Sequence, residues 1–169
     1  MSTSQDLTIR PVRPEDLPAV SALHRAAFGP GRFARTAYRV REGTPAITPH
    51  CRAAMLGTRL VAVLRFTEIR IGGKAGALLL GPVAIDPAVA GKGYGRALIA
   101  RAIDDARVAG NKLVLLVGDL PYYGRFGFTP VPHGQIALPG PVNPARLLAL
   151  ELVPQALTEF RGVVTADRS

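Results

Sequence analysis

The sequence predicts an α+β fold built on a mixed sheet, and three observations support that prediction. Strand-like and helix-like segments follow one another in the order β-α-α-β-β-β-α-β-α-β. Residues 93–110 repeat apolar side chains at helical spacing, which indicates a helix with one buried face. Residues 112–118 form a continuous apolar run, which is typical of a strand buried on both faces.

The first half of the chain is expected to supply a strand, two helices and a hairpin. Alternating apolar and polar residues predict the first strand, and acidic residues open the helical pattern behind it. Two strand patterns around Gly57-Thr58 predict the hairpin. In chain order these elements are expected at residues 7–13 (strand), 14–28 (helix), 29–45 (turn and short basic helix), 50–56 and 60–71 (hairpin).

A proline interrupts the strand that follows, at residues 75–87. Proline removes a ladder hydrogen bond, so a bulge or a splay is expected at Gly81-Pro82. Gly110-Asn111 is a stop signal for the next helix. The remaining elements are expected at residues 93–110 (helix), 112–118 (strand), 119–128 (short helical turn) and 147–152 (strand), with room for one more strand.

The composition indicates one globular, cytoplasmic domain spanning residues 1–169. Apolar residues make up 48% of the 169 residues, yet no apolar run reaches the roughly 18 residues that a membrane helix needs. The N-terminus lacks a signal-peptide pattern, and the single cysteine, Cys51, excludes an intramolecular disulfide. We therefore expect a cytoplasmic location and no membrane partner.

The formal charge of +9 suggests an anionic partner. Only three of the cations are lysines, and the chain has no basic run of five or more and no aromatic–basic interleaving. These features argue against nucleic acid and leave a phosphorylated cofactor as a partner. An arginine-rich composition inherited from a GC-rich genome explains the charge equally well.

Three glycines, Gly91, Gly93 and Gly95, crowd the turn before the 93–110 helix. The segment does not match the Walker loop pattern G-x-x-x-x-G-K-[ST], because Lys92 precedes Gly93 and no Ser or Thr follows. A dinucleotide fingerprint would need a third glycine where Arg96 stands. Two interpretations remain open: a flexible turn, or backbone N–H groups at a helix N-terminus that hold a diphosphate.

The glycine turn, the buried strand behind it and the segment "YYGRFGF" together resemble the GNAT acyltransferase superfamily. Gly93 and Gly95 match the family's [RQ]-x-x-G-x-[GA] turn, and residues 122–128 match its [FY]-Y-x-x-x-G-F segment. The resemblance is strongest over residues 79–130. It implies a GNAT-like fold, in which a mixed, mostly antiparallel sheet is splayed at its fourth strand and flanked by helices. The C-terminal tail looks like a bacterial branch of predicted small-molecule or peptide N-acetyltransferases.

This resemblance implies a site for acetyl-coenzyme A. The backbone of Val83, Ala84 and Ile85 is expected to pair with the pantetheine arm, and one N–H, that of Val83, to face the thioester oxygen. Tyr122 is expected in packing or beside the adenine, and Arg125 beside the 3′-phosphate. The diphosphate is expected on the turn residues Gly91, Lys92, Gly93, Tyr94, Gly95 and Arg96.

Two side chains are the candidate catalytic groups. Tyr123 matches the family tyrosine that donates a proton to the leaving thiolate, although aromatic packing would also explain it. Glu68 is the first candidate for the general base, ahead of the other candidates Glu151, His50 and His133. No metal is expected. One position departs from the family pattern: the first arginine or glutamine of the turn motif is Ala90 here, which predicts weaker cofactor binding.

The sequence therefore predicts an N-acetyltransferase that moves an acetyl group from acetyl-coenzyme A to a primary amine by direct attack in a ternary complex. The acceptor is expected to be a small molecule or a peptide, and the scarcity of acids between residues 14 and 70 favours a neutral or anionic amine. The resemblance also suggests a homodimer. Two alternatives stay open: a non-catalytic module that senses acyl-coenzyme A, and an acetyltransferase acting on aminoacyl-tRNA through Arg32, Arg35, Arg39 and Arg41.

Overall fold

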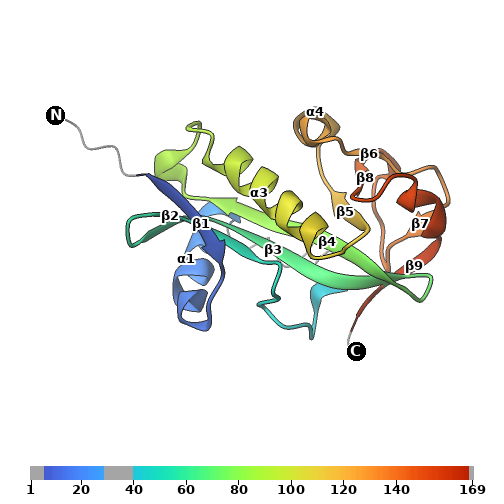
Figure 1. The fold of residues 1–169 in the computed structure, drawn as a ribbon, viewed down its shortest axis with the longest axis horizontal. Coiled ribbons are helices and arrows are strands. Elements are labelled where there is room, and N and C mark those ends of the chain that lie inside the picture. Colours follow the sequence, from blue (N-terminus) through green and yellow to red (C-terminus); the bar gives the residue numbers. More distant parts are fainter. Residues whose placement is uncertain (1–5, 29–39, 168–169) are drawn as a thin grey trace.

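The computed structural model describes residues 6–28 and 40–167, and a mixed sheet forms its centre (Figure 1). The strands lie in the order β1-β2-β3-β4-β5-β8-β6, and β9 pairs with both β3 and β7. Among these described residues, paired strands run antiparallel except β4 with β5 and β7 with β9. The strands are β1 (Leu7–Pro11), β2 (Arg52–Leu56), β3 (Arg59–Ile71), β4 (Lys74–Ile85), β5 (Leu113–Val117), β6 (Thr129–Pro130), β7 (Ile136–Ala137), β8 (Leu147–Glu151) and β9 (Gly162–Ala166).

Helices cover both faces of this sheet (Figure 1). On one face α1 (Leu17–Phe28) packs on β3 and β4, and on the other face α3 (Tyr94–Val108) packs on β2, β3 and β4. The short α4 (Leu120–Tyr123) follows β5. Single 3-10 turns lie at Pro14–Asp16, Pro87–Val89, Gly124–Phe126, Pro144–Arg146 and Ala156–Glu159. The basic helix predicted within 29–45 falls mainly on residues 29–39, which lie outside the described residues.

A bulge in β4 sets the geometry of the sheet. The ladder between β3 and β4 advances three residues along β4, from Leu80 to Val83, while it advances only two along β3. Gly81 and Pro82 therefore oppose a single residue, Arg65. This bulge lies where the sequence predicted one.

The bulge changes which side chains of β4 face α3. Before it, Leu78 and Leu80 belong to the buried cluster under α3, and after it Val83 and Ile85 pack against the same cluster. Ala84 instead belongs to the cluster under α1. Residues two apart share a face in a regular strand, so the extra residue shifts the alternation by one.

The strands β4 and β5 separate just before the bulge. Their parallel ladder ends at the pair Leu79–Leu115, and no later residue of β4 pairs with β5 within the described chain. The predicted splay of the fourth strand is therefore confirmed.

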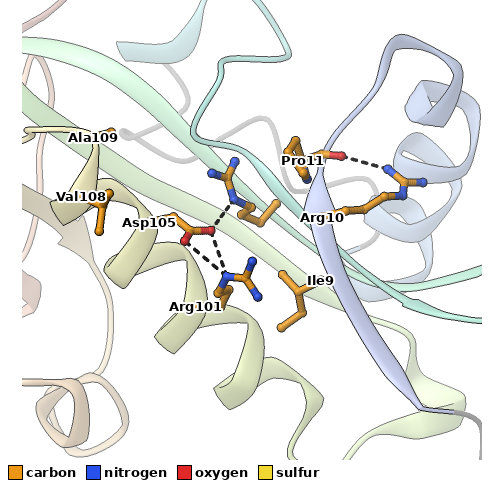
Figure 2. A pocket seen from close by; sticks show the side chains of 8 residues that line it. Ile9, Arg10, Pro11, Arg101, Asp105, Val108 and Ala109 are labelled. Carbon is orange, nitrogen blue, oxygen red and sulfur yellow. Dashed lines mark hydrogen bonds and ion pairs between the residues drawn. The ribbon is translucent and has the colours of Figure 1, made fainter.

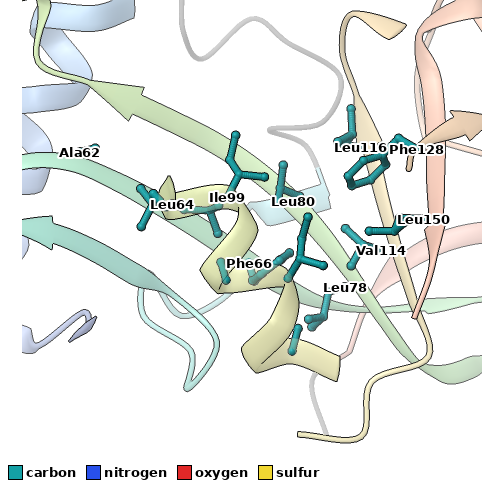
Figure 3. Close-up of a cluster of buried hydrophobic side chains, with 14 of the residues drawn as sticks. Ala62, Leu64, Phe66, Leu78, Leu80, Ile99, Val114, Leu116, Phe128 and Leu150 are labelled. Atoms are coloured by element: carbon teal, nitrogen blue, oxygen red, sulfur yellow. The ribbon is translucent and has the colours of Figure 1, made fainter. Parts of the chain in front are cut away.

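The core under α3 is continuous from β2 to β8. Figure 3 shows Leu64, Phe66 and Leu80 around Ile99 of α3, and Phe128 beside Leu116 of β5. These side chains are at most 3% exposed. The predicted apolar face of the helix is confirmed by the burial of Leu98, Ile99, Ala102, Ile103 and Ala106.

Most predicted elements are found close to their expected bounds. The hairpin around Gly57-Thr58 is β2 and β3, and the strand at 147–152 is β8. The helix stop is also confirmed: Gly110 has a left-handed φ of 94°, and the Asn111 N–H donates to the carbonyl of Ala106 at 3.2 Å. None of the helices in the described ranges is long and apolar enough to cross a membrane.

Asp16 fastens the start of α1 to β1. Its carboxylate accepts hydrogen bonds from the Arg10 guanidinium at 2.7 and 2.9 Å and from the Arg13 N–H at 2.8 Å. The bonds from Arg10, the largest cause, and from Arg13 lower the pKa of Asp16 from 3.8 to about 2.

We expect Asp16→Asn to lower the free energy of unfolding by about 1–2 kcal/mol at pH 7. Because the folded pKa lies below the unfolded value, this stability is complete above about pH 4 and is lost as the pH falls through about 2. Urea unfolding should show the wild type and the variant converging in acid. Asp104→Asn, at an exposed ion pair with Arg107, is the control and should change stability by less than about 0.5 kcal/mol. An undiminished Asp16→Asn difference at pH 2 would contradict this role.

Candidate active site

The turn between β4 and α3 is exposed, and its backbone is left-handed at two positions. Gly91 and Gly93 both have a φ of 82°, which residues with a side chain rarely adopt. A Cβ atom added at either glycine would meet no atom of the described chain within 4 Å. Glycine is therefore needed here for the shape of the backbone, and the space beside the turn is open.

Gly95 has a different role, because its neighbours are close. A Cβ atom there would lie 2.4 Å from Cδ1 of Ile85 and 3.7 Å from the phenolic oxygen of Tyr122. The missing side chain lets the first turn of α3 approach β4, and the Tyr122 hydroxyl of α4 lies near the same point. The glycine turn and the "YYGRFGF" segment are therefore close neighbours.

The N-terminus of α3 is suited to an anion. Its first intrahelical hydrogen bond runs from the Ala97 N–H to the carbonyl of Gly93 at 3.1 Å, so the N–H groups of residues 94–96 have no partner within the helix. The helix dipole and the exposed side chains of Lys92 and Arg96 add positive charge. Such a turn can bind a diphosphate.

An open edge of β4 leads away from this turn. Val83, Ala84 and Ile85 keep their ladder with β3, but in the described chain no strand pairs with their other edge. A free edge can pair with another extended group through its backbone N–H and C=O groups.

Tyr123 belongs to an aromatic cluster on α4. Its ring centre lies 5.0 Å from that of Tyr122 and 5.9 Å from that of Phe128, both in edge-to-face contact. Burial raises the pKa of Tyr123 above its usual value of 10, and Tyr122 and Asp119 add to the shift. The phenol is therefore protonated at neutral pH and can donate a hydrogen bond.

Residues of these separate segments share one side of the sheet. Val83, Ile85, Tyr94, Tyr122 and Tyr123 all pack against the buried cluster under α3. Arg125 is exposed, and its guanidinium carbon lies 4.8 Å from the centre of the Tyr122 ring.

Gly118 positions Tyr123, and the sequence analysis missed it. A Cβ atom at Gly118 would lie 2.7 Å from Cε2 of Tyr123 and 3.0 Å from Cδ1 of Leu116. The available signal was a glycine directly between a buried strand and the short helix. It allows the tyrosine ring to pack across the end of β5.

Glu68 stands apart from this group. Its strand partner is Leu78, and it lies four residues along β3 from Leu64, the partner of Val83. That separation is roughly 13 Å at about 3.3 Å per residue. Its Oε1 lies 3.7 Å from Nε2 of His50. Burial lowers the pKa of His50, although Glu68 opposes the shift, so the imidazole is neutral at pH 7.

The other two base candidates lie in the C-terminal region. The carboxylate of Glu151 accepts a hydrogen bond from the Leu157 N–H at 2.9 Å, which ties it to the loop after β8. His133 is exposed in the loop between β6 and β7.

Ala90 is exposed at the position where the family pattern has a long side chain. A different contact braces the chain before the turn. Asp86 accepts a hydrogen bond from the Ala88 N–H at 2.9 Å and pairs with Arg59 of the hairpin. The entry to the turn is therefore fixed from β3, although nothing at position 90 can reach across it.

A pocket of about 300 Å³ lies elsewhere, between β1, the start of β2 and the second half of α3. Three of its charged groups pair with one another: Asp105 accepts hydrogen bonds from Arg52 at 2.9 Å and from Arg101 at 3.2 Å (Figure 2). The fourth, Arg10, pairs with Asp16. This pocket is distinct from the glycine turn and supplies none of the groups described above. In the described ranges no group of three or more His, Cys, Asp or Glu side chains is arranged to hold a metal ion.

Residues 8–131 match the family model described as an acetyltransferase (GNAT) domain. This match spans most of the chain and both motif segments, so the protein belongs to the GNAT acetyltransferase family. The membership and the fold class predicted from the sequence are thereby confirmed.

Individual relatives agree with this assignment. The chain is 25% identical over 159 residues to the uncharacterized N-acetyltransferase YhbS of Escherichia coli K12, a match covering 94% of this chain and 95% of YhbS. The structure of E. coli YhbS in complex with CoA superposes with a TM-score of 0.83 at 24% identity, over 99% of this chain and 93% of that one. A GNAT family acetyltransferase from Brucella melitensis, in complex with acetyl-CoA, superposes with a TM-score of 0.73 at 26% identity over 97% of both chains.

We expect Gly118→Ala to lower the free energy of unfolding by about 1–3 kcal/mol, because the added methyl group overlaps the Tyr123 ring. The clash is with that ring, so the cost should fall by at least about 1 kcal/mol in a Tyr123→Leu background. Urea unfolding of the four proteins in this double-mutant cycle measures the coupling. Additive effects would show that Gly118 does not position Tyr123.

Proposed function

We propose that the protein transfers an acetyl group from acetyl-coenzyme A to a primary amine, by direct attack in a ternary complex. The observation that carries this proposal is the open edge of β4 at Val83–Ile85, which precedes the glycine turn along the chain and shares one side of the sheet with Tyr123. The CoA and acetyl-CoA complexes of the E. coli and Brucella relatives support it.

The glycine turn fits the diphosphate of the donor. The open space beside Gly91 and Gly93 leaves room for an anion against the backbone. In the proposed complex the N–H groups of residues 94–96 bind the phosphate oxygens, and Lys92 and Arg96 neutralise their charge. Ala90 contributes no side-chain brace, so backbone amides carry most of the affinity. Tyr122 and Arg125, stacked on each other, are assigned to the adenosine end.

The free edge of β4 is assigned to the pantetheine arm. Val83, Ala84 and Ile85 already pair with β3, so an extended arm adds to the sheet on the other side like a further strand. We assign the Val83 N–H to the thioester oxygen, where charge develops as the amine attacks. One such preorganised donor is worth on the order of 3 kcal/mol.

In the reaction a C–N bond to the acetyl carbon forms as the C–S bond breaks. The amine loses one proton, and the sulfur of the leaving group gains one. Tyr123 is assigned to the sulfur: its phenol is a weaker acid than a thiol of pKa near 8.5, so full transfer is uphill by about 2 kcal/mol or more. A hydrogen bond that strengthens in the transition state is sufficient.

The amine must lose its extra proton before it attacks. A lysine-like amine with a pKa near 10.4 is uncharged in only about one molecule per thousand at neutral pH. We keep Glu68 as the candidate base. Its distance along β3 from the partner of Val83 requires a water chain, and its neighbour His50 is a neutral group that can relay the proton.

The aminoacyl-tRNA alternative gains no support from the described residues. Arg32, Arg35 and Arg39 lie outside them, and Arg41 is only 8% exposed. A cytoplasmic location and a homodimer stay predictions.

We expect Tyr123→Phe to lower kcat for acetyl transfer by about 100-fold, because it removes the proton donor and keeps the ring. Its Kd for acetyl-CoA, measured by calorimetry, should stay within about threefold of the wild-type value. Phe126→Leu, which disturbs the same aromatic cluster without removing a hydroxyl, is the packing control and should retain kcat within about threefold. If the wild-type protein binds acetyl-CoA but acetylates no amine, the proposed acetyl transfer is wrong. That result would favour the alternative, a non-catalytic module that senses acyl-coenzyme A.

We expect Glu68→Gln to lower kcat by about 10–100-fold at pH 7 if Glu68 accepts the amine proton. The loss should shrink toward pH 10, where more of the amine is already uncharged. Steady-state rates between pH 6.5 and 9.5 measure this, with Glu159→Gln as a control at an exposed ion pair. Equal rates for Glu68→Gln and wild type across that range would remove Glu68 from the mechanism.

A further inference from the structure

Two arginines meet at the bulge of β4. Arg65 is the residue of β3 that opposes Gly81 and Pro82. Arg41, from the segment between α1 and β2, reaches the same point: its Nη2 lies 2.8 Å from where a Cβ atom of Gly81 would be. A side chain at position 81 would displace this guanidinium, so Gly81 makes room for Arg41.

This arginine pair lies on the face of the sheet opposite α3. Leu64 and Phe66, the neighbours of Arg65 along β3, both point into the cluster under α3, so Arg65 points the other way. Val40, the neighbour of Arg41, packs in the cluster that includes Leu79 on that opposite face. The arginines and the groups assigned to the acetyl donor thus approach the bulge from opposite sides.

The guanidinium of Arg65 is held in place. Its Nη2 donates to the hydroxyl of Thr44 at 2.8 Å and to the carbonyl of Pro45 at 3.2 Å. The Thr44 hydroxyl in turn donates to the carbonyl of Arg41 at 2.6 Å. One short segment therefore connects both arginines, so their positions are coupled.

A buried hydroxyl lies on the same face of β3 as Arg65. Thr67 is 1% exposed, and its Oγ1 has no hydrogen-bond partner among the described residues. It lies two residues from Arg65 on the same face of β3, roughly 7 Å along the strand. A buried hydroxyl without a partner is costly, so this group is poised for a ligand that can accept its hydrogen bond.

We propose that the acceptor amine carries a carboxylate, which binds between Arg41 and Arg65 with the Thr67 hydroxyl as a further donor. The inference rests on the proposed acetyl transfer, whose acceptor must reach the thioester from the face that the donor leaves open. Guanidinium groups match the planar oxygens of a carboxylate, often with two parallel hydrogen bonds. A polyamine has no carboxylate for these guanidinium groups to bind. Amino acids and short peptides that present both groups close together fit this description.

The first test compares acceptors that differ only in charge. A panel of L-amino acids is assayed with acetyl-CoA beside the matching amino acid amides and spermidine. We expect kcat/KM to be about 10–100-fold higher for the best amino acid than for its amide. Acetylation of the amides or of spermidine with equal or higher kcat/KM would overturn the carboxylate site while leaving the acetyl transfer intact.

The second test uses variants of the cluster. Arg65→Gln should reduce the acid-to-amide ratio to within about threefold, mainly through the acceptor KM, with the KM for acetyl-CoA unchanged. Thr67→Val should reduce the ratio several-fold without lowering the free energy of unfolding, because it removes an unsatisfied hydroxyl. Arg161→Gln removes the same charge at an exposed site on the C-terminal segment and should keep the wild-type ratio. A ratio that neither Arg65→Gln nor Thr67→Val changes would overturn the assignment.

A binding measurement tests the carboxylate site separately from the proposed acetyl transfer. The best amino acid, or the whole panel if none is acetylated, is titrated by calorimetry into the protein loaded with CoA. Binding that Arg65→Gln weakens by about tenfold or more supports the carboxylate site even if no acetyl transfer occurs. If protein that binds CoA neither binds nor acetylates any carboxylate-bearing amine, the carboxylate site is wrong. The amino acid affinity of Arg41→Gln is compared with that of the wild type only if this variant binds CoA with the wild-type Kd.

Discussion

The separation of β4 from β5 is the constraint on which the rest of the structure depends. Backbone N–H and C=O groups in a sheet need partners, so an edge left open in the middle of a sheet must be stabilised or filled. Two features release β4 here. Gly81 takes a φ of 122°, which needs a glycine, and Pro82 has no N–H to leave unpaired. The opening therefore arises from two adjacent residues, and the glycine turn, α3 and Tyr123 are all placed around it.

The fold was readable from the sequence because its signals are local. The Gly81-Pro82 pair, the glycines before α3 and the apolar period of that helix each depend on neighbouring residues alone. β6 and β7 were not predicted individually, because two residues are too few to show an alternating pattern.

The site was readable only in part. The two motif segments could be matched residue by residue, and in the structure Gly95 of the first lies near the Tyr122 hydroxyl of the second. The position of Gly118 beside Tyr123 could not be predicted from the sequence, since it depends on where a ring from the next helix packs. The meeting of Arg41 with Gly81 joins residues forty positions apart, and no spacing rule predicts it. Glu68 was chosen because β4 has no acid and Glu68 lies on the strand before it, a criterion that ignores how far along that strand it lies.

The bulge also fixes the phase of β4. Restoring a regular strand by deleting one residue between Leu80 and Val83 would turn the side chain of Ile85 away from Gly95 and bring Ala84 under α3. Nothing in the ladder with β3 could correct such an exchange of faces. The packing on both faces of β4 therefore constrains the length of this strand as well as its side chains.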